Sequence, residues 1–274
     1  MKLSVCLATF NEEKFIHYPL DSTYEIADEV IIVDGGSTDK TLEIARSYGD
    51  KVKIISTDNP PMFHINKQKA IEAAQGEWIL QLDADEALSE ELKKEIQGII
   101  ADPTEKLTKN EVAFWMPRKN FFLTRFLLKG GQYPDYTIRF YKNGTVRFPC
   151  KTVHENVELI PTDKKIGYLQ QALLHYADPE FSRYLHRWDR YTTLDAELMV
   201  KHAKDPQLLL RGMGAWISYF IWQPFYTFFM MYFRHKGFMD GFPGFVFALF
   251  SSVRFWLIYI KVWQFREKSS LTSS

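Results

Sequence analysis

Short apolar runs alternate with helix-like segments over the first hundred residues of the chain. Four largely apolar runs predict strands, at 2–9, 30–33, 52–56 and 78–82, and the first two are expected to be buried. Helical patterns lie between them, up to about residue 26 and at 41–48 and 66–75, and the last two are closed by Gly49 and Gly76. This alternation predicts an α/β fold with a doubly wound, mostly parallel sheet.

Polar side chains follow three of these strands. Asn11, Asp34 and the pair Asp83 and Asp85 come directly after apolar runs. Ligands of doubly wound sheets bind beside the carboxyl ends of the strands, so we expect these groups to converge at one edge. Two carboxylates one residue apart suit a hard cation such as Mg²⁺ or Mn²⁺. An acidic loop before a helix near Ser89 explains the same pair, and a plain turn with a helix cap explains Asp34.

Beyond residue 112 the pattern changes. Two strand-like runs flank Asn143-Gly144 between 137 and 148, which predicts a β-hairpin with a type I′ turn. Residues 178–205 have a polar, helical pattern. His175, His186 and three nearby arginines form a basic group there, which is either a solvated helix face or a site for an acceptor phosphate.

Three motifs together closely resemble glycosyltransferase family 2: ATFNEE at 8–13, VIIVDGGSTDKT at 30–41 and WILQLDADE at 78–86. The resemblance covers about residues 1–160. It implies a GT-A fold and inverting transfer from a nucleotide-sugar donor, with UDP-sugars as the expected donors. It implies that the nucleotide is bound by Thr9, Asn11, Glu12, Asp34 and Lys67. It also implies that Asp85 binds a divalent metal directly, with Asp83 beside it and nearer the ribose.

A longer segment, from GGQYPDY at 130 to VHEN at 156, resembles a bacterial subgroup that includes lipopolysaccharide-core glucosyltransferases. In that subgroup an acid after the central sheet is the general base, which implies Asp135, with Glu155 as the alternative. The family's Glu-Asp dipeptide is missing here, and an ordinary polar turn also accounts for Asp135. His154 is expected to complete the Mn²⁺ or Mg²⁺ shell unless it is structural. Arg139 either reaches the diphosphate or points to solvent.

The C-terminal quarter is strongly aromatic. Nineteen of the 43 aromatic residues lie between Trp216 and Trp263, and 212–233 carries no charge. A second apolar stretch, 241–263, is interrupted by Arg254 and Lys261. The length allows spanning, but a basic joint facing outward opposes the positive-inside tendency. We therefore expect two helices lying in the cytosolic leaflet, with packing on the protein as the alternative.

Charge and cysteine content narrow the classes of function. The 34 basic and 34 acidic residues balance, which argues against a dedicated nucleic-acid binder. Residues 201–274 hold nine Lys/Arg and three Asp/Glu, a net +6, so the remainder is −6. Two cysteines, Cys6 and Cys150, cannot build a disulfide scaffold and are expected to be reduced. The apolar stretch 3–10 has no cleavage pattern, so the front is expected in the cytosol.

These observations predict four segments: a GT-A domain at 1–175, a helical connector at 176–211, a membrane-associating segment at 212–266 and a disordered tail at 267–274. The predicted function is sugar transfer from a nucleotide donor to a lipid-linked or membrane-surface glycan such as lipopolysaccharide core. The expected location is the cytoplasmic face of the inner or plasma membrane. The alternatives are a sugar-nucleotide nucleotidyltransferase and a non-catalytic nucleotide-sugar-binding membrane protein.

Overall fold

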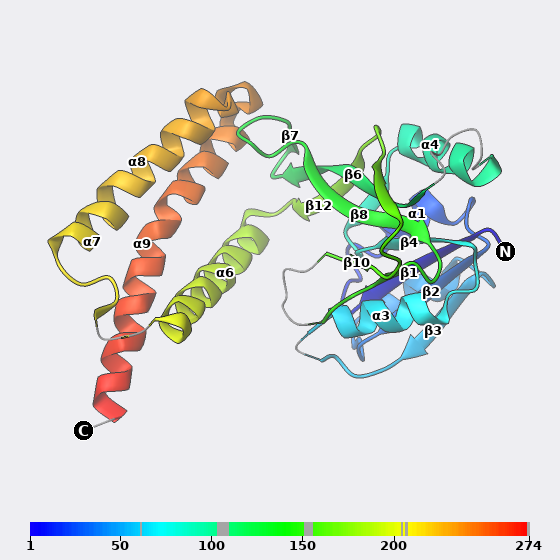
Figure 1. The fold of residues 1–274 in the computed structure, drawn as a ribbon, viewed down its shortest axis with the longest axis horizontal. Coiled ribbons are helices and arrows are strands. Elements are labelled where there is room, and N and C mark those ends of the chain that lie inside the picture. The colour runs from blue at the N-terminus through cyan, green and yellow to red at the C-terminus, as the bar shows by residue number, and fades with distance from the viewer. Residues whose placement is uncertain (61, 103–109, 151–155, 204, 206–207, 273–274) are drawn as a thin grey trace. The chain divides into compact units, whose positions relative to one another are not determined.

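The computed structural model describes residues 1–60, 62–102, 110–150, 156–203, 205 and 208–272 (Figure 1). The chain forms two compact units. The first contains residues 1–119 and 134–176, and the second contains residues 120–133 and 177–274. Residues 120–133 therefore belong with the C-terminal residues, an association that the sequence pattern does not predict.

Four parallel strands form one half of the sheet in the first unit. They are β1 (Leu3–Thr9), β2 (Glu29–Asp34), β3 (Val52–Ser56) and β4 (Trp78–Leu82), in the spatial order β3-β2-β1-β4. β2 and β4 are buried along their whole length and β1 nearly so, which explains why these segments lack polar alternation. All four predicted strands are confirmed.

The other half of the sheet is mixed. β8 (Asp135–Lys142) lies between β4 and β6 (Glu111–Phe122) and is antiparallel to both. The order continues through β12 (Leu173–Asp178) to β5 (Glu86–Leu88), while β7 (Arg125–Leu127) and β11 (Lys165–Tyr168) pair with β6. The predicted α/β class with a mostly parallel sheet is confirmed.

Helices cover both faces of this sheet. Side chains of α1 (His17–Thr23), α2 (Thr41–Ser47) and α4 (Glu90–Ala101) join one buried cluster, and those of α3 (His64–Ala73) join the other. The expected start of α4 is confirmed, because the Ser89 hydroxyl accepts the Leu92 N–H at 3.2 Å. α1 ends at Thr23, three residues earlier than expected. After it, the Asp28 carboxylate accepts the N–H groups of Lys2 and Leu3, and these bonds fix the chain where it enters β2.

The predicted hairpin around Asn143-Gly144 is wrong. β8 does not pair with β9 (Val146–Arg147); instead β9 pairs with β10 (Glu158–Leu159) in a separate small sheet. A strand has only two edges, and those of β8 are occupied by β4 and β6. The turn also lacks type I′ geometry, since Gly144 has φ +73° but Asn143 is not among the residues with positive φ.

The second unit is helical after β12. α6 (Phe181–His202) is followed by α7 (Met213–Ile217), the π-helix η2 (Ser218–Trp222), α8 (Gln223–Phe228) and the π-helix η3 (Phe229–Arg234). A 3₁₀ turn, η4 (Gly237–Asp240), leads into α9 (Gly241–Thr272), which runs back beside α7 and α8 (Figure 1). α9 extends to Thr272 and so includes part of the segment predicted to be disordered. Residues 267–272 contain no Gly or Pro that would end a helix.

α9 and the turn before it are also apolar. Within the described part of the chain, Gly237–Lys268 is the one helical span long and apolar enough to cross a membrane. Length and composition alone support that statement.

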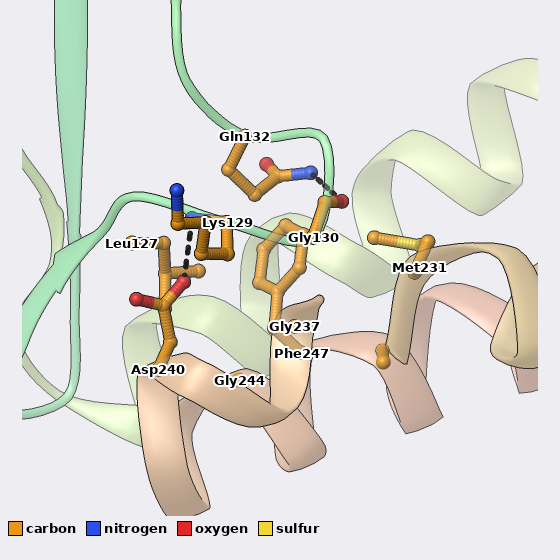
Figure 2. Close-up of a pocket in the computed structure, with 10 residues that line it drawn as sticks. Leu127, Lys129, Gly130, Gln132, Met231, Gly237, Asp240, Gly244 and Phe247 are labelled. Carbon is orange, nitrogen blue, oxygen red and sulfur yellow. Dashed lines mark hydrogen bonds between the residues drawn. The ribbon is translucent and has the colours of Figure 1, made fainter. Parts of the chain in front are cut away.

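The turn around η4 is a tight joint that fastens residues 128–130. The buried Asp240 carboxylate accepts the N–H groups of Leu128 and Lys129 at 3.0 and 2.8 Å (Figure 2). A Cβ on Gly244 would lie 2.1 Å from the Gly237 carbonyl oxygen, so a side chain is excluded at that position. The cavity here holds about 10 Å³, enough for one water at most. This element is a packing joint and not a ligand site.

Candidate functional site

Asp34 ends β2 and organises its own glycine turn. Its carboxylate accepts the N–H groups of Gly36 and Ser37 at 2.9 Å each, the Ser37 hydroxyl at 2.5 Å and the Thr9 hydroxyl at 3.3 Å. A carboxylate has about four acceptor positions, and these four bonds use them. A nucleotide that binds the Asp34 side chain must therefore replace one of these donors. The nucleotide roles of Thr9 and Asp34 remain predictions.

Asn11 and Glu12 connect the loop after β1 to the loop after β2. Asn11, which has φ +56°, donates its N–H to the Ser37 hydroxyl and accepts the Thr38 N–H at 2.8 Å. The Glu12 N–H bonds to the Thr41 hydroxyl at 2.7 Å. The N–H groups of this loop are thus bonded to side chains of the neighbouring loop. The predicted contacts of Asn11 and Glu12 with a nucleotide also remain predictions.

Asp83, at the end of β4, is held between two cations. Lys67 of α3 pairs with one carboxylate oxygen, and Arg139 of β8 bonds the other at 2.5 Å. Burial alone would raise the pKa of Asp83, but the charges of Arg139 and Lys67 outweigh burial and hold it well below its usual range. Burial also lowers the pKa of Lys67, and the attraction of Asp83 opposes that only in part. Asp83 is therefore ionised, and its negative charge is balanced by Lys67 and Arg139.

Glu86, which the sequence analysis did not select, lies at the centre of the site. It is fully buried, and its two oxygens accept Nε and Nη2 of Arg139 at 3.0 Å each and Nη1 of Arg118 at 3.2 Å. The second oxygen also accepts the Asp83 N–H at 2.9 Å. Arg139 thus points into the site, not to solvent. Glu86 is the first residue of the short strand β5 and directly follows Asp83 and Asp85 in the sequence, so no local pattern distinguishes it from these acids.

Arg118 connects Glu86 to the candidate base. Its Nε and Nη2 both donate to one oxygen of Asp135, at 3.0 and 2.7 Å. Burial would lower the pKa of Arg118, but Glu86 and Asp135 raise it above its ordinary value. The cluster contains three cations and three carboxylates in ion-pair contact: Lys67, Arg118, Arg139, Asp83, Glu86 and Asp135.

The topology explains why these groups meet. β1, β2 and β4 are parallel and side by side, so their carboxyl ends share one edge of the sheet. β8 is antiparallel to β4, with Phe140 opposite Leu80, so its first residue, Asp135, lies at that same edge. Asn11, Asp34, Asp83 and Asp85, which were expected to converge, lie at or just after strand ends that share this edge, and β8 brings Asp135 and Arg139 to it. A cavity of about 390 Å³ lies elsewhere, between α4, β6 and β11.

Asp85 has a partner that the sequence analysis assigned to a different group. Nε2 of His175, on β12, lies 3.5 Å from a carboxylate oxygen of Asp85, and the Tyr176 N–H bonds the Asp85 carbonyl at 2.8 Å. Carboxylate and neutral imidazole are both ligands of Mn²⁺. Within the described ranges no set of three His, Cys, Asp or Glu side chains could hold a metal ion. His154 and Glu155 lie outside those ranges.

The donor chemistry at this edge therefore fits a divalent metal at Asp85 better than at Asp83. Asp83 is neutralised by Lys67 and Arg139, whereas Asp85 stands beside an imidazole. Two candidate ligands, Asp85 and His175, are in place among the described residues.

Comparison with known proteins identifies the relatives of this chain. A family model described as glycosyl transferase family 2 matches residues 4–153. An uncharacterized glycosyltransferase of Rickettsia bellii is 30% identical over 93% of this chain and 84% of its own length. The lipopolysaccharide core biosynthesis glycosyltransferase LpsC of Rhizobium meliloti is 25% identical over 96% of this chain and 93% of its own. Residues 1–349 of S. aureus TarS, solved with UDP-GlcNAc, align with a TM-score of 0.47 and 17% identity, covering 98% and 92% of the two chains.

Proposed function

Because the chain belongs to glycosyl transferase family 2, we propose that it transfers a sugar from a UDP-sugar, with inversion, to a lipid-linked or membrane-surface glycan. The observation that carries this proposal is the charge cluster at the ends of β4 and β8. It gathers fixed cations and the candidate base Asp135 at the edge where β4 ends, and the candidate metal ligand Asp85 follows two residues after Asp83. Such preorganised charges suit a reaction in which a nucleoside diphosphate departs.

The proposed metal site consists of Asp85 and His175, with His154 as the predicted third ligand. Lys67 and Arg139 make Asp83 available as an oriented acceptor near the nucleotide without a metal beside it. Arg139 is the proposed diphosphate contact, and because its three nitrogens are bonded to Glu86, Gln81 and Asp83, a diphosphate must replace one of these bonds. When bound, Mn²⁺ or Mg²⁺ stabilises the negative charge of the leaving diphosphate.

Asp135 is the proposed general base, and Glu155 is the alternative. In the transfer, the acceptor oxygen bonds to the anomeric carbon, the bond from that carbon to the diphosphate oxygen breaks, and the acceptor proton passes to the carboxylate. Arg118 fixes the position of Asp135 through two hydrogen bonds to one carboxylate oxygen. Tyr136 and Tyr168 stand edge to face, with ring centroids 5.5 Å apart, and supply aromatic surface next to this residue.

Lipopolysaccharide core is the proposed acceptor class, because LpsC of Rhizobium meliloti is named for that biosynthesis and aligns over nearly the whole chain. An acceptor of this kind stays in the membrane. The apolar span Gly237–Lys268 supports attachment of this enzyme to the cytoplasmic face of the inner or plasma membrane.

The rival nucleotidyltransferase reading is less well supported. Such enzymes cradle phosphates with backbone N–H groups after the first strand. Here the N–H groups of Asn11, Glu12 and Glu13 are bonded to Ser37, Thr41 and Asp39.

The test is transfer from a panel of UDP-sugars to lipopolysaccharide extracts by the detergent-solubilised protein, with UDP release and product mass as readouts. The proposal predicts one preferred donor and dependence on Mn²⁺ or Mg²⁺. Asp135→Asn and Glu155→Gln separate the two bases: the variant of the true base retains donor binding and loses turnover. Release of pyrophosphate instead of UDP would indicate the nucleotidyltransferase.

A further inference from the structure

The segment 213–234 alternates between α and π turns. α7 and α8 are α-helical, whereas η2 and η3 contain the i to i+5 bonds of a π-helix, such as Gln223 N–H to the Ser218 carbonyl and His235 N–H to the Met230 carbonyl. An α turn contains 3.6 residues and a π turn contains more. Alternation brings the average close to four residues per turn. Residues spaced by four are therefore aligned along the helix axis.

This geometry straightens an apolar row that a regular helix would wind around itself. In an α-helix each step of four residues rotates by about 40°, so five steps rotate by about 200°. Six residues at this spacing are all exposed here, between 45% and 72%: Met213, Ile217, Ile221, Phe225, Phe229 and Phe233. Aromatic pairs four apart are stacked, including Trp222 with Tyr226 and Phe225 with Phe229, at interplanar angles of 21° and 20°. We call these six residues the apolar row.

α9 adds apolar surface and keeps its charges on another side. Phe242, Trp256, Ile260 and Trp263 are exposed. Arg254 pairs with Asp195 of α6, and Lys261 bonds the Asp189 carboxylate and the Thr192 hydroxyl at 2.7 and 2.8 Å. The two cations that interrupt the apolar stretch in the sequence are thus neutralised by α6.

α6 makes a membrane-spanning α9 untenable. Ala196 of α6 packs against Ile258 and Val262 of α9, and the Trp188 indole N–H bonds the Phe250 carbonyl at 3.1 Å. The opposite side of α6 exposes charged residues, among them Arg190 and Glu197. If α9 crossed a bilayer, this face would enter the hydrocarbon with it at a high cost. Only one side of the helical unit can therefore contact lipid.

The charges around the apolar row favour anionic lipid over protein as its partner. Exposed Arg211 precedes the row and exposed Arg234 and Lys236 follow it, while residues 206–239 include no Asp or Glu. Pairing with the same row of a second copy would bring basic ends together in either orientation. An anionic headgroup layer complements both ends at once, and the aromatic middle fits the boundary between headgroups and acyl chains.

We infer that the apolar row lies in the plane of one anionic leaflet over about 30 Å, with α6 on the water side and without crossing the bilayer. This inference is independent of the proposed reaction. This mode of binding differs from attachment through scattered aromatic residues, because neighbouring members of a straight row should contribute together to lipid binding.

Vesicle flotation with the full chain tests the partner. We expect binding to vesicles of 3:1 phosphatidylcholine and phosphatidylglycerol and much weaker binding to phosphatidylcholine alone. Phe225→Ser and Phe229→Ser should each weaken binding about tenfold or more, since each removes one buried aromatic side chain from the lipid. Leu198→Ser, at an exposed position on α6, is the matched control and should bind as the wild type does. Equal binding by all variants, or loss of dimerisation instead of lipid binding, would overturn the inference.

Cysteine labelling from outside sealed vesicles tests the topology. In a Cys150→Ser background the remaining Cys6 is buried, so Arg234→Cys at the turn and Lys201→Cys on α6 report on their own sites. A membrane-impermeant maleimide should label both positions when the protein is added from outside. Protection of Arg234→Cys until detergent is added would show that segment 213–234 and α9 cross the bilayer, and it would contradict the inference. Neither readout requires turnover.

Discussion

The two units of this chain place charge and aromatic surface in opposite ways. In the first unit, three cations and three carboxylates are gathered at one sheet edge, with Glu86, Lys67 and Arg139 buried. In the second, Arg254 and Lys261 are paired against α6, while phenylalanine and tryptophan side chains face outward. Buried ions and exposed aromatic groups are both unfavourable without partners. The ions of the first unit are paired with one another within the fold, whereas the exposed aromatic surface of the second unit indicates an apolar binding partner.

The largest effect should come from Asp85. Asp85→Ala removes the proposed metal carboxylate, and we expect about a thousandfold loss of transfer with an unchanged unfolding midpoint, because several kcal/mol of charge stabilisation are lost. Initial rates with a saturating donor measure this. Asp163→Ala, which removes a side chain that pairs with its neighbour Lys164, is the control. Activity within tenfold of wild type would exclude Asp85 from the metal site.

Glu86 should dominate the stability of the first unit. Glu86→Gln leaves Arg118 and Arg139 with too little negative charge, and breaking a buried ion pair costs about 3 kcal/mol of unfolding free energy. Chemical denaturation followed by circular dichroism measures the change. Glu90→Gln, at an exposed residue of α4, should leave stability unaltered. If both variants unfold at the same denaturant concentration, the ion pairs of Glu86 do not stabilise the first unit.

Asp83 should make the first unit sensitive to acid. Its pKa is lowered in the folded state, so the folded protein binds fewer protons than the unfolded chain at intermediate pH, and stability rises with pH there. The stabilisation is complete above about pH 4, the unfolded value, and is lost as pH falls through the folded-state pKa. Denaturation at several pH values between 2 and 4 should show a slope near 1.4 kcal/mol per unit. Asp83→Asn should flatten this slope, and an unchanged slope would assign it to other groups.

Lys261 should have the smallest effect. Lys261→Met keeps the apolar stem against α6 and removes the bonds to Asp189 and Thr192, at a cost of about 1 kcal/mol. Thermal unfolding of the full chain measures it, with Lys201→Met at an exposed position of α6 as the control. A loss several times larger would mean that the second unit also depends on a buried ion network.

Local pattern was sufficient for the buried parallel strands and for the acids at their ends. β1, β2 and β4 are largely apolar and buried, and the sheet topology places the polar groups at or just after their carboxyl ends at one edge. The predicted hairpin failed because a turn signal cannot report that both edges of β8 are already paired. Glu86, Arg118 and His175 were missed for a related reason. Their partners lie 17 to 90 residues away, and only the tertiary fold brings them together.

Calorimetric titration of UDP into the detergent-solubilised chain, with Mn²⁺ and then with EDTA, tests the central claim most directly. The account predicts binding with Mn²⁺, strong weakening with EDTA, and the same weakening in Asp85→Ala with Mn²⁺ present. Equal binding by wild type and Asp85→Ala under both conditions would contradict the assignment of the metal and donor site to the carboxyl end of β4.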